Sequence, residues 1–275
     1  MLNVEKFIRP ATVAAAVTQL KAPDAIVLAG GTGVSLSRDP AVRTVIDLSD
    51  LAELKRIERS EGRIRIGAMV TMTQLRRDSG LPPALVAAAR AIGSTPLRNV
   101  ITVGGELARG VYWNDLPVLL LAMDAVVELT TEAGAEKLAI AAFLAEHPKK
   151  TLAGGRLITA VEIEDHFTHV SFLKFARTEV DYAICDLACG LRVEDGVIRE
   201  ARVAVGALVP LARRIPEVEQ ALTGAALNDE TIARAARAAV AAVEPRPDFR
   251  VSREYQRQLL ENLTRRVLES AGHPG

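Results

Sequence analysis

Two glycine pairs stand where apolar, strand-like runs end, and no other residues of this chain are better suited to bind a ligand. The first lies in Ala29-Gly30-Gly31-Thr32-Gly33 and the second in Thr102-Val103-Gly104-Gly105. Successive glycines allow positive φ angles, so several backbone N–H groups can turn toward one point and hold an anion without a lysine. Two such loops would hold one elongated anion between them, and a dinucleotide is the natural candidate. The alternative is two unrelated turns at strand ends.

Other chemistry is sparse along the chain. Neither glycine loop has the spacing of a Rossmann fingerprint or a P-loop. Asp165, His166 and His169 lie close in sequence without further ligands, so we expect no metal site, and no Ser-His-Asp arrangement or other catalytic side chain is indicated. Cys185 and Cys189 are too few for an iron–sulfur cluster and are expected to be buried free thiols, with a redox role as the alternative.

The composition excludes several classes of protein. The 275 residues are 49% hydrophobic and 25% charged, which predicts a folded chain with a sizeable core. Basic and acidic residues balance at 34 each and aromatic residues make up only 4%, so a nucleic-acid surface is not expected. The longest apolar run, 116–123, contains a proline and is far shorter than a membrane span. We therefore expect a cytoplasmic protein without a membrane span.

The pattern of elements changes near residue 166. Before it, helices and strands alternate, with strands expected at 25–29, 44–47, 63–67, 100–103, 125–129 and 156–163 and helices at 11–20, 73–78, 82–92 and after Asp115. After it come three consecutive strands, 170–175, 183–193 and 197–206, then three helices, 215–222, 229–243 and 252–269. The fold class is α+β, with domains at 1–165 (lobes at about 1–58 and 59–165) and at 166–275, the latter a three-stranded antiparallel sheet with helices.

A series of short motifs carries a specific resemblance, through their order rather than through any single one. They are Ala29-Gly30-Gly31-Thr32, Arg63-Ile64-Arg65-Ile66-Gly67-Ala68, Ile92-Gly93-Ser94 with Arg98-Asn99, Thr102-Val103-Gly104-Gly105, Asp115-Leu116-Pro117, Phe172-Leu173-Lys174-Phe175-Ala176-Arg177, Ala201-Arg202-Val203-Ala204-Val205-Gly206 and Asp248-Phe249-Arg250-Val251-Ser252. This series resembles the FAD-binding medium subunits of the molybdenum hydroxylases, which include xanthine dehydrogenase and carbon monoxide dehydrogenase. The resemblance covers nearly the whole chain.

The resemblance implies a two-lobed FAD-binding domain of the vanillyl-alcohol-oxidase (PCMH) type, followed by the C-terminal domain. The cofactor-binding residues it implies are Val27, Leu28, Ala29, Gly30, Gly31, Thr32, Gly33, Gly93, Thr102, Gly104, Gly105, Asp115, Leu157, Ile158 and Lys174. Asp115 is explained equally well as a helix N-cap, and Lys174 has the alternative of being a solvated lysine on a surface sheet.

The same resemblance implies an electron-transfer role. FAD on this chain would receive electrons from [2Fe-2S] clusters on an iron–sulfur small subunit, while a large subunit would hold the molybdenum-pterin cofactor. Electrons would leave to NAD+, oxygen or another acceptor. The alternatives are a scaffold subunit that has lost FAD and a stand-alone flavin oxidoreductase.

Several residues depart from the family pattern near the predicted phosphates. Glu106 follows the second glycine pair where asparagine is usual, Arg109 replaces a small polar residue, Pro96 stands for a glutamine, and Gly33 for an aspartate. A carboxylate about 5 Å from a phosphate is opposed by roughly 3 kcal/mol at an effective dielectric constant near 20. We therefore expect Glu106 to pair with Arg109 or to turn away from the phosphates.

Overall fold

The computed structural model describes residues 3–37 and 39–272, and the chain divides into two compact units. Both units are discontinuous in sequence. The first consists of Met1–Leu75, Ser94–Gly110 and Val126–Ile163, and the second of Arg76–Gly93, Val111–Ala125 and Glu164–Gly275.

The first unit begins with a small parallel sheet. Its strands, in the order β1-β3-β2, are β1 (Lys6–Ile8), β3 (Thr44–Asp47) and β2 (Ala25–Leu28). Helix α1 (Val13–Gln19) precedes β2, and the Thr12 hydroxyl caps it by accepting a hydrogen bond from the Ala15 amide. The predicted helix and the strands at 25–29 and 44–47 are confirmed, whereas β1 was not expected because three residues are too few to show a period.

The second sheet of the first unit has five strands. In spatial order they are β4 (Ile57–Ser60), β5 (Arg63–Gly67), β8 (Leu157–Glu164), β6 (Val126–Thr131) and β7 (Gly134–Ala139). Strands β5, β6 and β8 were predicted; β4 and β7 were not, because as edge strands they are largely exposed and lack apolar alternation. The remaining pieces are η1 (Val34–Leu36), η2 (Ala52–Lys55), α4 (Thr95–Arg98), α7 (Ile140–Phe143) and α8 (Pro148–Thr151), while α2 (Met72–Arg77) crosses the unit boundary.

The predicted strand at 100–103 is wrong. Only an isolated bridge joins Thr102 to Thr71, and helix α5 (Val103–Arg109) begins immediately after Thr102. Gly104 and Gly105 therefore lie in the first turn of a helix and not in a loop at a strand end.

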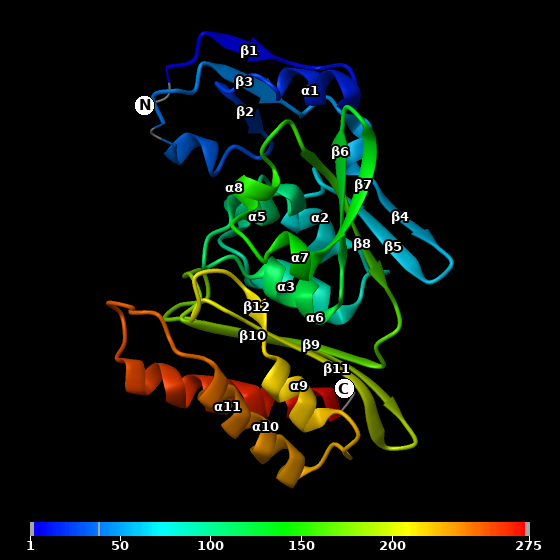
Figure 1. Ribbon diagram of the computed structural model, residues 1–275, viewed down its shortest axis with the longest axis vertical. Coiled ribbons are helices and arrows are strands. Elements are labelled where there is room, and N and C mark those ends of the chain that lie inside the picture. Colours follow the sequence, from blue (N-terminus) through cyan, green and yellow to red (C-terminus); the bar gives the residue numbers. More distant parts are fainter. Residues whose placement is uncertain (1–2, 38, 273–275) are drawn as a thin grey trace. The chain divides into compact units, whose positions relative to one another are not determined.

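The second unit is built on an antiparallel sheet with helices on both faces. Its strands are β9 (His169–Phe175), β10 (Cys185–Glu194), β11 (Val197–Gly206) and β12 (Arg213–Arg214), and its helices are α3 (Pro83–Ala91), α6 (Leu116–Ala122), α9 (Pro216–Leu222), α10 (Asp229–Ala242) and α11 (Arg253–Gly272). Figure 1 shows α9, α10 and α11 on one face and α3 and α6 on the other. The three predicted strands and three helices are confirmed, but the two-residue β12 adds a fourth strand.

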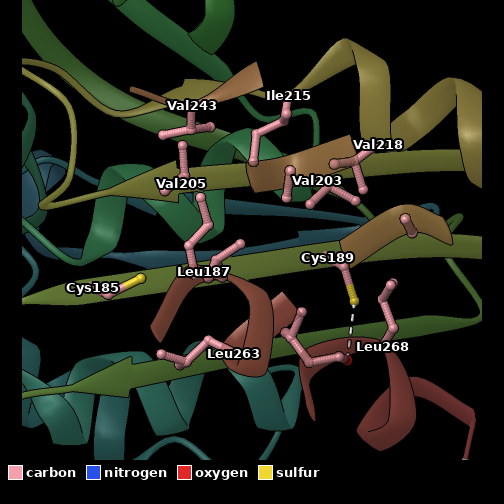
Figure 2. Packing of buried hydrophobic residues seen from close by; sticks show 14 of the residues in the cluster. Cys185, Leu187, Cys189, Val203, Val205, Ile215, Val218, Val243, Leu263 and Leu268 are labelled. Carbon is pink, nitrogen blue, oxygen red and sulfur yellow. Dashed lines mark hydrogen bonds between the residues drawn. The ribbon is translucent and has the colours of Figure 1, made fainter. Parts of the chain in front are cut away.

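Alternation along β10 divides its side chains between these two faces. Cys185, Leu187 and Cys189 point toward α11 and belong to a buried cluster that includes Val203, Val205 and Leu263 (Figure 2). Both cysteines are free and buried, and the Cys189 thiol donates to the carbonyl of Val267, with Sγ and O 3.4 Å apart. Burial raises the pKa of the Cys189 thiol to about 12, so this thiol is not a nucleophile at neutral pH.

The predicted domain boundary at residue 165 stays a prediction, because the two compact units of the structure are not continuous in sequence. Two segments that precede it, 76–93 and 111–125, belong to the second unit, where α3 packs on β9 and α6 packs on β10 and β11.

Candidate cofactor site

The first unit contains a cavity of about 430 Å³, and four chain segments supply most of its lining. They are the end of β2 with the loop that follows it, the turn after β5, the start of α5, and the start of β8. The predicted cofactor residues at this cavity are Val27, Ala29, Gly30, Gly31, Thr32, Gly33, Thr102, Gly104, Gly105, Leu157 and Ile158. Both glycine pairs therefore line the same space.

The loop after β2 presents backbone amides that the protein itself does not use. Among the described residues, the amides of 30–33 donate to no acceptor of the chain. Gly31 has a φ of +77°, which turns the chain at this point, and glycine at 30 lets the loop pack against the Val100 carbonyl, since a Cβ there would lie 1.6 Å from its oxygen. Free amides lining a cavity are suited to binding the oxygens of an anion.

The second glycine pair serves a different purpose from the one predicted. The Gly104 amide donates to the carbonyl of Ala68 at 2.8 Å, and the Gly105 amide donates to the Thr102 hydroxyl at 3.1 Å. A Cβ at Gly104 would lie 2.9 Å from that of Ala68. These glycines therefore allow close packing and cap α5, and the predicted second nest of free amides is wrong.

The cavity also contains three ionisable residues. Glu106 is buried and Arg109 half-buried, both on α5, and Arg156 precedes β8. The guanidinium of Arg156 donates to the carbonyl of Thr151 at 3.2 Å, whereas the Arg109 side chain passes close to Gly33, since a Cβ there would be 3.8 Å from its Cδ. The carboxylate that departs from the family pattern thus shares its cavity with two cations.

The rest of the lining is largely aliphatic, and sequence reasoning missed most of it. The additional apolar residues are Leu20, Ile26, Val34, Leu48, Met69, Ile101 and Leu152. Their types are those of any buried position, so no local signal distinguishes them from the core. A cavity with free amides beside aliphatic walls fits a ligand that has both an anionic part and a large apolar part, as FAD does.

The structure does not place four of the predicted cofactor residues at this cavity. Leu28 is absent from its lining. Gly93, with a φ of +54°, Asp115 and Lys174 all belong to the second unit. Their predicted contact with the cofactor stays a prediction.

Asp115 and Lys174 form a buried ion pair within the second unit. The Lys174 ammonium donates to Oδ2 of Asp115 at 2.8 Å and to the carbonyl of Ala91 at 2.9 Å. The Lys174 side chain is only 8% exposed, so the alternative of a solvated surface lysine is wrong. The N-cap explanation of Asp115 is also wrong, because its side chain makes no capping hydrogen bond although it directly precedes α6.

Two further features are absent from the described part of the chain. No cluster of three or more His, Cys, Asp or Glu side chains suitable for a metal ion is present there. Nor does any helix within residues 3–37 and 39–272 have the length and apolar character needed to cross a membrane.

An α+β chain with unused amides and aliphatic walls around one cavity belongs, by fold and site, to the class of proteins that bind an elongated anionic cofactor. Residues 2–163 match the family described as the FAD binding domain in molybdopterin dehydrogenase, and residues 170–271 match the CO dehydrogenase flavoprotein C-terminal domain.

Relatives of the same kind align over almost the whole chain. A xanthine dehydrogenase FAD-binding subunit of Escherichia coli O157:H7 is 31% identical, over 98% of this chain and 97% of that protein. The nicotine 6-hydroxylase medium subunit of Paenarthrobacter nicotinovorans is 30% identical over 90% of each chain. Among solved structures, carbon monoxide dehydrogenase from Hydrogenophaga pseudoflava has a chain with a TM-score of 0.91 at 27% identity, covering 97% of this chain and 96% of its own.

The chain therefore belongs to the FAD-binding subunits of the molybdenum hydroxylase family, and it is an oxidoreductase subunit with FAD as its cofactor. The resemblance of the motifs, the fold class and the FAD assignment are confirmed.

Proposed function

We propose that this chain is the flavin-carrying electron-transfer subunit of a molybdenum hydroxylase, with FAD bound in the cavity of the first unit. The partners are an iron–sulfur small subunit with [2Fe-2S] clusters, which delivers electrons, and a large subunit with the molybdenum-pterin cofactor. The electrons leave to NAD+, oxygen or another acceptor. The observation that carries the proposal is the set of unused amides at 30–33 beside aliphatic walls in one cavity.

Each part of the cavity has a role in holding the cofactor. The amides of 30–33, which donate to no acceptor of the described chain, would hold the diphosphate oxygens. Leu157, Ile158 and their aliphatic neighbours exclude water from the apolar part of the ligand. When bound, the flavin supplies the redox chemistry. The protein therefore binds, orients and shields, and no side chain of this chain acts as a general acid or base.

Glu106 is the residue most at odds with a diphosphate in this cavity. Two cations, Arg109 and Arg156, line the same space, and we infer that their positive charge offsets the Glu106 carboxylate. Replacing Glu106 with Asn removes the negative charge and shortens the side chain by one methylene. We expect Glu106→Asn to bind FAD about as tightly as the wild type, measured by titration of the apoprotein. A large rise in affinity would show instead that the carboxylate faces the phosphates without compensation.

The spectrum and the co-purifying chains test the proposal as a whole. We expect the protein, isolated with its native partners, to show flavin absorbance bands and to carry an iron–sulfur chain and a molybdenum chain identified by mass spectrometry. Absence of flavin from the native complex would favour the scaffold subunit. Flavin in a chain that purifies alone would favour the stand-alone oxidoreductase.

A further inference from the structure

A single acidic residue, Asp186, lies in the middle of the sheet of the second unit. It is fully buried on β10, directly opposite Lys174 on β9 and Gly206 on β11. Residues directly opposite one another in a sheet share a face, and this is the face that α6 covers. The Asp186 carboxyl group is therefore enclosed between the sheet and a helix.

The surroundings of Asp186 are fitted to its side chain. A Cβ at Gly206 would lie 2.6 Å from Oδ1 and 3.0 Å from Oδ2 of Asp186, and 2.5 Å from Cγ2 of Val118. Only glycine at 206 leaves room for the carboxyl group. All seven residues of α6 are buried, and its sequence Leu-Pro-Val-Leu-Leu-Leu-Ala offers no polar side chain.

The polar groups facing Asp186 leave its oxygens without a donor. The titratable groups among them are Asp115 and Lys174, whereas the thiol of Cys185, next along the strand, points to the opposite face of the sheet. The Lys174 ammonium donates to Oδ2 of Asp115 and to the Ala91 carbonyl. Within the described residues, Oδ1 of Asp115 and both oxygens of Asp186 are buried with no hydrogen-bond partner.

Two carboxylates beside one ammonium would leave a net negative charge in apolar surroundings, where an unpaired ion costs several kcal/mol. One proton removes this charge and supplies the missing donor. We propose that Asp186 is a neutral carboxylic acid that donates a hydrogen bond to Asp115, and that it thereby positions Asp115 and Lys174.

The direction of both pKa shifts agrees with this arrangement. Burial, followed by the Asp115 charge, raises the pKa of Asp186 well above its usual value. Burial also raises the pKa of Asp115 to about 6, although the Lys174 charge opposes that rise. At neutral pH Asp115 is therefore ionised and paired with Lys174, while the proton resides on Asp186.

The pH dependence of stability tests this proposal. A neutral Asp186 makes the folded state less stable as the pH rises, whereas an ordinary ion-paired aspartate makes it more stable. The folded protein keeps a proton on Asp186 that the unfolded chain releases above about pH 4, so raising the pH favours unfolding. Asp186→Asn is already neutral and can still donate to Asp115. We expect its Tm to exceed that of the wild type by about 3 °C or more at pH 8, and the two to converge near pH 4.

Asp248 provides a matched control of opposite sign in the same unit. A hydrogen bond from Arg250 lowers the pKa of Asp248, so its ionised form stabilises the fold above about pH 4. Asp248→Asn should therefore lower Tm at pH 8. A Tm of Asp186→Asn that is equal to or below that of the wild type at pH 8 would mean that Asp186 is ionised in the fold, and would overturn the proposal.

Two further measurements do not depend on unfolding. The infrared spectrum of the native protein at pH 7 should contain the carbonyl stretch of a protonated carboxylic acid that is absent in Asp186→Asn, and its absence from the wild type would overturn the proposal. The positioning role rests on the proposed function. If Asp186 positions Asp115 and Lys174, Asp186→Ala should lower the FAD content of the protein, and Asp186→Asn should retain it. Equal FAD content in both variants would refute positioning, whereas a wild type without flavin would refute the proposed function and leave the infrared result intact.

Discussion

At the scale of single residues, the absence of a Cβ atom from glycine determines how closely segments of the first unit pack against one another. A Cβ at Gly30 would lie 1.6 Å from the carbonyl oxygen of Val100, and one at Gly67 would lie 2.3 Å from that of Leu54. These are contacts with backbone atoms, which cannot be relieved by rotating a side chain. The free amides at the cavity depend on this close packing, since it fixes the loop that carries them.

Gly30→Ala tests this packing. The added Cβ would overlap a backbone carbonyl, so we expect a loss of about 1–3 kcal/mol or more in the free energy of unfolding, measured by chemical denaturation. Gly33→Ala is the control for stability, because its φ is −83° and its nearest neighbour would be 3.8 Å away. Equal stability of the two variants would contradict the close approach of residues 30 and 100.

Sequence reasoning at this scale identified the right glycines but only half of their role. The glycine pair at 30–31 was predicted to expose its amides and does so. The pair at 104–105 was predicted to do the same, yet its amides are bonded to Ala68 and Thr102. The pattern of glycines could not distinguish these cases, because the partners come from distant parts of the chain. A lone aspartate in the apolar run around 186 was visible in the sequence, but its neutrality follows only from the residues packed against it.

At the scale of elements, the start of α5 shows how a strand-like sequence becomes the beginning of a helix. Val100, Ile101, Thr102 and Val103 are four β-branched residues in succession, which favours a strand. Hydrogen bonds instead join this segment to the turn before α2, since the Met72 amide donates to the Ile101 carbonyl and the Val103 amide donates to the Val70 carbonyl. With Thr102 as N-cap, the helix then begins at residue 103.

Thr102→Ala removes the hydroxyl that caps α5, so the Gly105 amide loses its hydrogen-bond acceptor. We expect a loss of about 0.5–2 kcal/mol in the free energy of unfolding. Thr102→Ser keeps the hydroxyl and should retain most of the stability. If both variants lose the same amount in denaturant titrations, the missing methyl group rather than the cap would be responsible.

The elements that the sequence predicted well are those with strong, sustained patterns. Strand β11 agrees with its predicted bounds at both ends, because the tight Asp195-Gly196 turn fixes its start and the apolar alternation continues to Gly206. Strands β1 and β12, of three and two residues, carry no period that could reveal them. Their pairing is decided by the neighbouring strands β3 and β11, which only the folded chain brings beside them.

At the scale of the whole molecule, the sequence indicated a boundary where the pattern of elements changes, whereas packing assigns earlier segments to the later unit. Helix α6 has no exposed residue, and its packing partners in the second unit are α3, β9, β10, β11 and β12. Segment 111–125 is also tied to that unit by Arg202, whose Nε donates to Oδ2 of Asp124 at 2.7 Å. A period of apolar residues reveals that a helix is buried, but not which sheet buries it.

A fragment of residues 1–165 tests this difference. It contains α6 without strands β10 and β11, so the apolar side chains of 116–122 lose the sheet that covers them and about 1.5–3 kcal/mol of burial for each large one. We expect the fragment to aggregate in size-exclusion chromatography under conditions where the full chain is monodisperse.

The same fragment with Leu119, Leu120 and Leu121 replaced by glutamine isolates the cause. If the uncovered face of α6 drives association, these replacements reduce the aggregated fraction, because the exposed helix is then polar. A wild-type fragment 1–165 that elutes as a monomer with native-like circular dichroism would contradict the assignment of α6 to the second unit. It would establish residue 165 as a folding boundary.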